Sequence, residues 1–149
     1  GFFMESFNSF IQKEINKTFV QDNHSKSKKG VIRGLHYQWD KPMGKLLRVV
    51  KGTGLEIIVD IRESSPTYGV WSGFKLSDIN NGILWVPPGF ANGFLALEDD
   101  THLCYKTTAL HNNNAEGAIN PLKSGLDIIL SKKDKIAQTF ENYKLNPKF

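Results

Sequence analysis

The chain has 149 residues, of which 40% are hydrophobic and 23% charged, and its net charge is +4 at pH 7. This composition predicts one globular domain over residues 1–149 with enough apolar residues to bury a core. No apolar run is long enough to cross a bilayer. The densest basic run, 26–29 (KSKK), lacks the interleaved aromatic residues typical of a nucleic-acid surface. We therefore expect neither a membrane nor a nucleic acid as partner, and the mild positive charge suits a small anionic ligand.

Cys104 is the single cysteine of the chain. An intrachain disulfide is therefore impossible, which fits a reducing compartment, and we expect a cytoplasmic location. Because Cys104 lies between Leu103 and Tyr105, the sequence indicates a small core residue rather than a nucleophile.

Glycines and prolines interrupt the chain about every ten residues, and the runs between them are rich in β-branched and aromatic residues. This spacing is typical of an all-β sandwich or barrel. The expected strands are 18–21, 30–37, 45–50, 54–61, 70–76, 82–86, 93–97, 101–107 and 127–130. The run 55–61 is apolar on nearly both faces, which predicts a central strand.

Two short helices complete the prediction. Apolar residues spaced near 3.6 indicate a helix over 6–16. A second helix is expected over 131–142, with Ser131 as its N-cap and Asp134 at its third position.

The expected strand 30–37 carries one arginine and one histidine three residues apart. Regular alternation would send Arg33 and Leu35 to one face of the sheet and Gly34 and His36 to the other. A strand holds a histidine rigidly, as a general base requires. A lone histidine is nevertheless more often a core residue that is hydrogen-bonded to a neighbour.

The segment 85–94 is a corner followed by a strand, because two prolines prevent continued pairing and a glycine permits a tight turn. Such corners are common at the mouth of a small barrel, where ligands bind. Pro87, Pro88 and Gly89 themselves are explained by the corner alone.

The sequence offers no metal or cofactor site. None of the four histidines lies two residues from another, so the His-x-His pair of metal-binding β-barrels is missing. There is also no Gly-x-Ser-x-Gly segment for Ser-His-Asp hydrolysis. We expect no metal and no cofactor.

Six segments, taken together and in order, resemble the dTDP-4-dehydrorhamnose 3,5-epimerases, metal-independent enzymes of nucleotide-sugar metabolism. They are 19–25 (FVQDNHS), 33–38 (RGLHYQ), 44–50 (GKLLRVV), 59–62 with 65–69 (VDIR, SPTYG), 85–91 (WVPPGFA) and 105–108 (YKTT). The resemblance implies a jelly-roll (cupin-type) β-barrel with short flanking helices, a homodimer, and a dTDP-linked 4-keto-6-deoxy sugar bound in the barrel mouth. It also implies epimerisation at the carbons that flank the C4 ketone, giving the precursor of dTDP-rhamnose.

The resemblance assigns four catalytic roles. His36 matches the base, Asp134 the carboxylate that orients its imidazole, and Tyr105 the acid on the opposite face of the sugar. Lys45 matches the lysine near the ketone, where a positive charge steadies an enolate. Each of these residues, taken singly, also has an ordinary structural explanation.

The resemblance further assigns the substrate-binding positions. Arg33 matches a diphosphate-binding arginine, whose planar fork suits a phosphate. Phe3 and Glu5 match nucleotide-contacting positions, and Gln21 and Asn23 match polar positions at the nucleoside end.

The chain departs from the family pattern in two places near the expected site. Asn92 stands where the family usually has a histidine close to the ketone side of the sugar. As a substrate-binding residue its amide can still donate a hydrogen bond, but it cannot carry charge or relay a proton near neutral pH. In the segment after Tyr105, 110–111 (LH) and 119–121 (INP) replace a Tyr-Tyr pair and a Trp-x-Asp-Pro motif. These changes leave three alternatives: epimerisation at a single carbon, another 4-keto sugar nucleotide, or a non-catalytic sugar-nucleotide-binding protein. A 3,4-ketoisomerase ranks low, because it favours a second histidine where Gln38 stands.

Overall fold

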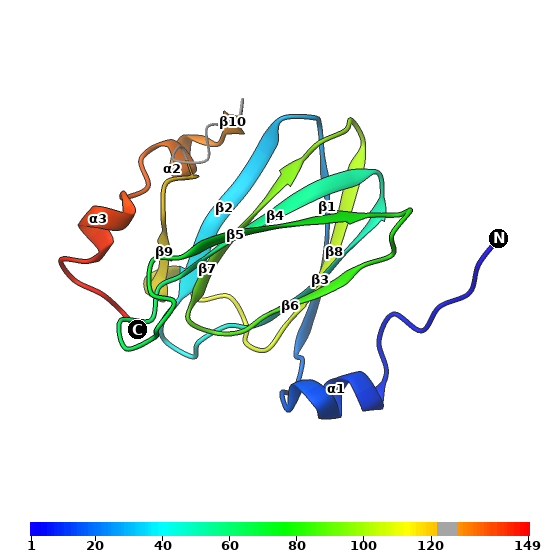
Figure 1. Ribbon diagram of the computed structural model, residues 1–149, viewed down its shortest axis with the longest axis horizontal. Helices are drawn as coiled ribbons and strands as arrows, with labels where there is room; N and C mark the ends of the chain where they lie inside the picture. Colours follow the sequence, from blue (N-terminus) through cyan, green and yellow to red (C-terminus); the bar gives the residue numbers. More distant parts are fainter. Residues whose placement is uncertain (122–127) are drawn as a thin grey trace.

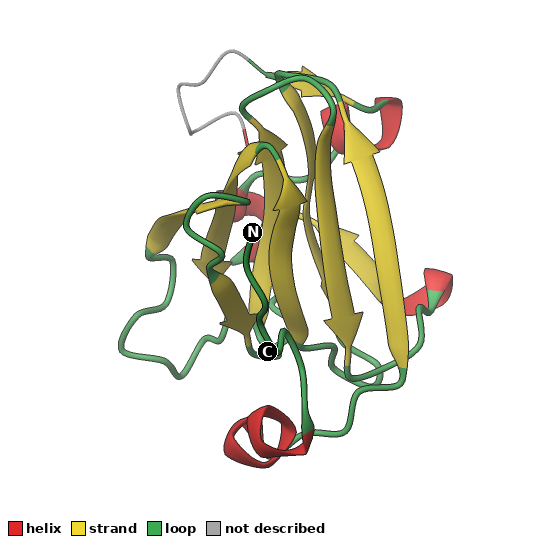
Figure 2. Ribbon diagram, turned by 90° about the vertical axis from the view of Figure 1, so that its right-hand side faces the viewer, coloured by secondary structure: helices red, strands yellow, loops and turns green. Residues whose placement is uncertain are grey.

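The computed structural model describes residues 1–121 and 128–149. Two sheets face one another in a jelly roll, with short helices at the periphery (Figures 1 and 2). Sheet A holds, in spatial order, β1 (Gln21–Ser27), β8 (Thr101–Thr107), β3 (Lys45–Lys51) and β6 (Ile83–Val86). Sheet B holds β10 (Ile129–Leu130), β2 (Val31–Gln38), β7 (Phe90–Ala96), β4 (Thr53–Asp60) and β5 (Trp71–Ser77), with β9 (Glu116–Ala118) paired to β2. The expected all-β jelly roll is confirmed.

Three details of the predicted strands were wrong. The first strand begins at Gln21, where the expected strand ended, and it pairs along its whole length with β8. Strand β9 was missed altogether. The last expected strand is reduced to β10, and its residue 127 lies outside the described part of the chain.

The helices are shorter than predicted. Helix α1 (Ser9–Ile15) is confirmed, and the side chain of Asn8 caps it. The expected helix 131–142 is divided into α2 (Lys132–Lys135) and α3 (Phe140–Tyr143), because Gln138 forms a bridge with Ile119 between them. Ser131 caps α2 as predicted, since its side chain accepts a hydrogen bond from the amide of Asp134. A 3₁₀ turn (Asn113–Ala115) precedes β9.

The apolar residues form two cores on opposite faces of sheet B. The intersheet core lies between the two sheets and includes Leu47, Val49, Phe94 and Leu103. The outer core lies between sheet B and the C-terminal segment and includes Ile32, Leu35, Ile57, Val59, Phe140 and Tyr143. Strand β4 sends side chains to both cores, as expected of a central strand. Cys104 belongs to neither core: it is partly buried on the outward face of sheet A, which corrects the prediction of a core residue.

The segment between β4 and β5 is held by one buried carboxylate. Asp60 is 1% exposed and accepts hydrogen bonds from Arg62 Nε (2.9 Å) and Nη2 (2.7 Å), Ser65 Oγ (2.6 Å) and Thr67 Oγ1 (2.6 Å). The Arg62 side chain lies against Gly89, where a Cβ would stand 2.5 Å from its Cγ. The segments 59–62 and 65–69, which resemble the family, therefore stabilise the fold.

Asp60→Ala is expected to lower the free energy of unfolding at pH 7 by about 2–5 kcal/mol, because it leaves several partly buried donors without an acceptor. Burial opposes ionisation of Asp60, but its hydrogen bonds outweigh this and hold its pKa well below the usual range. The charged carboxylate therefore stabilises the fold above the unfolded pKa of about 4, and this contribution is lost as the pH falls through the folded pKa. Urea unfolding at pH 7 and at acid pH measures both effects.

Asp22→Ala is the matched control, since Asp22 forms an exposed ion pair with Lys106 on the outward face of sheet A. Such pairs contribute about 0–1 kcal/mol. Equal losses for Asp60→Ala and Asp22→Ala would contradict the role given to Asp60.

Candidate active site

A bulge in β2 brings Arg33 and His36 to the same face of sheet B. Arg33 pairs with Phe94 and His36 with Asn92, so three steps along β2 oppose two steps along β7. Phe94 belongs to the intersheet core, and both residues therefore face sheet A. The regular alternation expected from the sequence, which separated Arg33 from His36, is wrong.

Two glycines permit this bulge. Gly34 has a φ of +131°, and a Cβ on it would lie 2.5 Å from the Cα of Gly93 on the neighbouring strand. The bulge also turns Leu35 into the outer core, where it is fully buried. The glycines thus allow the backbone contact that aims the His36 side chain at the space between the sheets.

His36 is bonded to a carboxylate from the far end of the chain. Its Nε2 lies 2.7 Å from Oδ1 of Asp134, whose side chain is 4% exposed. The Asp134 carboxylate also accepts a hydrogen bond from Ser131 Oγ at 2.8 Å. Strand β10 pairs with β2 directly before Ser131, which carries α2 to the edge of the sheet. The structure thus unites two residues that the sequence placed in one site.

A second cluster extends across the space between the sheets. Lys45 Nζ donates to Asn92 Oδ1 at 2.6 Å, and Asn92 Nδ2 donates to Glu56 Oε1 at 2.5 Å. Burial lowers the pKa of Lys45, and the charges of Glu56 and Glu116 oppose this shift. Burial raises the pKa of Glu56 to about 7, although Asn92 and Lys45 oppose it.

Tyr105 faces the same space from sheet A. It lies on β8 between Leu47 of β3 and Asn23 of β1. Burial raises its pKa; the charge of Arg33 opposes this, and the charges of Glu56 and Glu116 add to it. These interactions place the phenol within electrostatic reach of residues from three strands of sheet B.

A small recess of about 20 Å³ connects the two clusters. It is lined by His36, Tyr37, Gln38, Met43, Lys45, His111 and Glu116. Glu116 is bonded to Lys133, and its pKa is lowered by this and neighbouring positive charges despite burial, which acts in the opposite direction. Sequence analysis missed Glu56 and Glu116. A charged residue within the apolar run 55–61 was a usable signal for Glu56, whereas nothing local marks Glu116.

The predicted polar positions on β1 and β2 lie toward opposite ends of β1. Gln21 Nε2 donates to Asn23 Oδ1 at 2.7 Å, on the face of sheet A that carries Tyr105. Arg33 is exposed and donates to Ser27 Oγ at 3.1 Å and to the carbonyl of Lys26 at 3.3 Å. Both regions could contact the charged and polar parts of a nucleotide.

Phe3 and Glu5 are not brought to this cluster within one chain. Phe3 is 91% exposed, and Glu5 accepts a hydrogen bond from Asn8. Met4 between them contacts Arg48, which lies on the outward face of sheet A. The N-terminal segment therefore runs over the side of sheet A opposite Tyr105.

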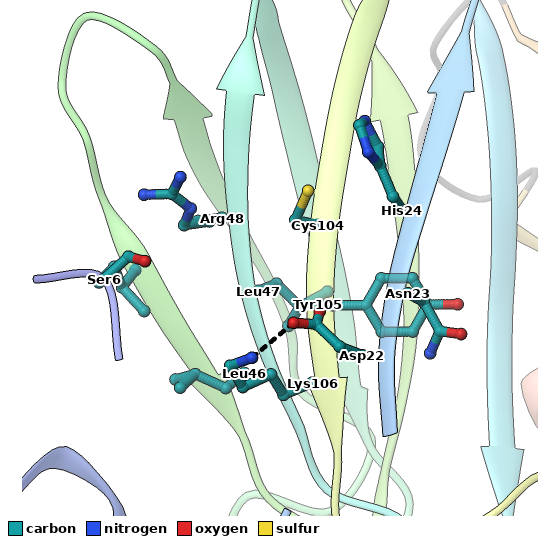
Figure 3. A pocket seen from close by; sticks show the side chains of 11 residues that line it. Ser6, Asp22, Asn23, His24, Leu46, Leu47, Arg48, Cys104, Tyr105 and Lys106 are labelled. Atoms are coloured by element: carbon teal, nitrogen blue, oxygen red, sulfur yellow. Dashed lines mark hydrogen bonds and ion pairs between the residues drawn. The ribbon is translucent and has the colours of Figure 1, made fainter. Parts of the chain in front are cut away.

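The outward face of sheet A also carries a larger cavity of about 340 Å³. Figure 3 shows His24, Arg48, Cys104 and the Asp22–Lys106 ion pair around it, with Ser6 of the N-terminal segment at its edge. His24 Nε2 lies 2.8 Å from His102 Nδ1 on this face. Asn23 and Tyr105, which face the intersheet space, also border this cavity (Figure 3). The other side chains around it were not predicted to take part in chemistry.

Within residues 1–121 and 128–149, no group of three or more His, Cys, Asp or Glu residues is arranged to hold a metal ion. No helix in these ranges is long and apolar enough to span a membrane.

Comparison with known proteins identifies the family of the chain. A family model described as dTDP-4-dehydrorhamnose 3,5-epimerase matches residues 1–142. The enzyme of that name from Methanothermobacter thermautotrophicus is 44% identical over 147 residues, covering 91% of this chain and 80% of the relative. The one from Shigella flexneri is 46% identical over 151 residues, covering 94% and 83%. A dTDP-4-dehydrorhamnose 3-epimerase from Streptomyces niveus is 35% identical over 127 residues, covering 79% and 61%.

Solved structures give the same result. The dTDP-6-deoxy-D-glucose-3,5-epimerase of Legionella pneumophila, in complex with dTDP-4-keto-L-rhamnose, superposes with a TM-score of 0.91 at 39% identity, covering 100% of this chain and 86% of that one. A 3'-monoepimerase from Streptomyces bikiniensis, in complex with dTDP-quinovose, has a TM-score of 0.88 at 27% identity, covering 95% and 77%. The chain therefore belongs to the dTDP-4-dehydrorhamnose 3,5-epimerase family.

Proposed function

We propose that this protein is an isomerase that epimerises a dTDP-linked 4-keto-6-deoxy sugar at C3, C5 or both. One observation carries the proposal beyond family membership: the bonded pair of His36 and the buried Asp134 faces the same intersheet space as Lys45 and Tyr105. A base and a cation that line one small recess, with an acid facing the same intersheet space, are the groups needed to invert a carbon next to a ketone.

In this proposal His36 removes the proton from the carbon α to the ketone. Because Asp134 accepts from Nε2, the neutral imidazole carries its proton there and leaves Nδ1 free as the base. The electrons move to the ketone oxygen, where the Lys45 ammonium stabilises the enolate. Tyr105 then donates a proton to the opposite face of the carbon, which inverts it.

The remaining predicted residues would hold the nucleotide. Arg33 offers a guanidinium for the diphosphate, and Gln21 and Asn23 offer amides at the nucleoside end. We propose that Phe3 and Glu5 act in a homodimer, where the N-terminal segment of one copy reaches its partner. Phe2 and Phe3, which are 73% and 91% exposed, support this, because apolar side chains are seldom left so exposed together. Sedimentation at a single monomer mass would rule it out.

The experiment that tests the function is proton NMR of dTDP-4-keto-6-deoxyglucose incubated with the protein in deuterium oxide. Deuterium at both C3 and C5, above the rate without protein, supports a double epimerase. Deuterium at C3 alone supports the single-carbon reaction, which the replacement of histidine by Asn92 favours. Absence of deuterium together with tight binding of dTDP would support the binding-protein alternative. The single cysteine supports a cytoplasmic location, which stays a prediction.

A further inference from the structure

The proposed reaction leaves one buried ionisable group without a role. Glu56 lies on β4 among apolar residues and is 0% exposed. Its Oε1 accepts from Asn92, whereas its Oε2 has no hydrogen-bond partner among the described residues. A buried carboxylate with an unpartnered oxygen is costly for the fold. Glutamate at this position therefore calls for a reason beyond packing.

The Asn92 amide joins Glu56 to Lys45 in a fixed direction. Lys45 Nζ can only donate, so it requires the amide oxygen, and it lies 2.6 Å from Oδ1. The amide nitrogen must then point the other way, toward Glu56 Oε1 at 2.5 Å. A reversed amide would place its N–H groups against the ammonium. The bonds therefore run from Lys45 in sheet A, through Asn92 on β7, to Glu56 on β4.

We infer that Glu56 is a positioning residue for the proposed epimerase reaction: through the Asn92 amide, its carboxylate holds the Lys45 side chain at the site and keeps its ammonium charged. Only the expected effect on catalysis rests on the proposed function. The coupling between Glu56 and Lys45 is a property of the protein without substrate.

The surrounding charges make Glu56 the main partner of Lys45. The ionisable groups around this pair are Glu116 from β9, whose charge acts on Lys45, and Tyr105 from β8, on which the charge of Glu56 acts. From β2, His36 lines the same recess as Lys45, and the charge of Arg33 acts on Tyr105. Burial favours the neutral amine of Lys45, and among the opposing influences Glu56 is larger than Glu116. Removing the Glu56 charge should therefore lower the pKa of Lys45 further. Asn92 adds no charge of its own, so the amide joins the two groups without titrating.

Glu56→Gln tests the inference directly, because glutamine keeps an oxygen that can accept from Asn92 but removes the charge. The protein is labelled with ¹³C at Cε of its lysines, and the Lys45 signal is identified by its loss in Lys45→Arg. We expect the Lys45 titration midpoint to move to lower pH in Glu56→Gln. Glu98→Gln removes an exposed carboxylate at the far end of β7 and should leave the midpoint in place. An unchanged midpoint in Glu56→Gln would overturn the inference.

Activity gives a second and separable result. In Glu56→Gln we expect kcat to fall about tenfold or more, as when an electrostatic contribution to the transition state is weakened. KM should change little, and the alkaline limb of the kcat profile should move to lower pH together with the Lys45 midpoint. A fall in kcat without this movement would indicate a structural role only and would also overturn the inference.

Two further results complete the design. If circular dichroism shows that Glu56→Gln does not fold, Glu56→Asp and Asn92→Leu are compared instead. Glu56→Asp keeps the charge, whereas Asn92→Leu breaks the hydrogen-bonded bridge. The Lys45 titration midpoint should therefore stay closer to that of the wild type in Glu56→Asp than in Asn92→Leu. Equal midpoints in these two variants would refute the coupling. If the midpoint moves as expected but no substrate is turned over, the proposed function fails while the coupling of Glu56 to Lys45 stands.

Discussion

His36→Asn is expected to lower the rate of deuterium incorporation at C3 and C5 of the sugar by about 10²–10⁴-fold, the usual contribution of a positioned general base. Asparagine can still donate a hydrogen bond to Asp134, so the C-terminal segment should stay docked. Proton NMR in deuterium oxide measures the loss of activity, and thermal melting shows whether the variant remains folded.

The control for this variant is a histidine of the same chain on the other side of sheet A. His24 is exposed on the outward face, where it pairs with His102. His24→Asn should leave deuterium incorporation unchanged. A similar loss in both variants, or full activity of His36→Asn, would exclude His36 as the base.

Tyr105→Phe should separate proton removal from inversion. His36 can still remove the proton, exchange it with solvent deuterium and return it to the same face, so the label should appear in the starting sugar. The inverted product should fall by about 10²-fold or more, because no acid remains on the opposite face. Proton NMR distinguishes the two, since the ring coupling constants report configuration and the loss of signal reports exchange.

The pKa of Tyr105 bears on the pH range of this step. Burial raises that pKa, so the phenol stays protonated at alkaline pH where an exposed tyrosine begins to ionise. We therefore expect the ratio of inverted to exchanged sugar to stay constant across neutral and mildly alkaline pH. Tyr68→Phe, at the edge of the outer core, is the control and should leave this ratio unchanged. Loss of exchange together with inversion in Tyr105→Phe would contradict the division of roles.

The sequence was sufficient for features that depend on local patterns. Alternation and turn residues predicted most strands within a few residues, and the capping pattern predicted Ser131 and Asp134 at the start of α2. The motif order predicted that His36 and Asp134 belong to one site although 98 residues separate them. Motif order carries this information because relatives share the whole fold.

Other features depend on contacts between distant segments, which a single sequence does not reveal. The bulge in β2 depends on the close approach of Gly34 to Gly93. It places Arg33 and His36 on the same face of sheet B, whereas regular alternation predicted opposite faces. Strand β9 is three residues long with glycine at its centre, so no alternation marks it; pairing with β2 creates it. Glu56 was read as part of an apolar strand, because nothing in the local sequence shows that Asn92 and Lys45 lie opposite.

Strand β10 is only two residues long, yet it is the backbone link between β2 and the residues just before Asp134. The chain beyond α2 is anchored separately, because Gln138 bonds to Tyr37 and Tyr143 is buried in the outer core. Helix α2 adds one turn, whereas within each of the two sheets neighbouring strands are paired along long ladders. Local opening of residues 129–135 alone would therefore need less free energy than unfolding of the barrel. The fraction of molecules with a complete His36–Asp134 pair is then set by an equilibrium separate from global stability, so turnover can be lost on warming while the sheets remain intact.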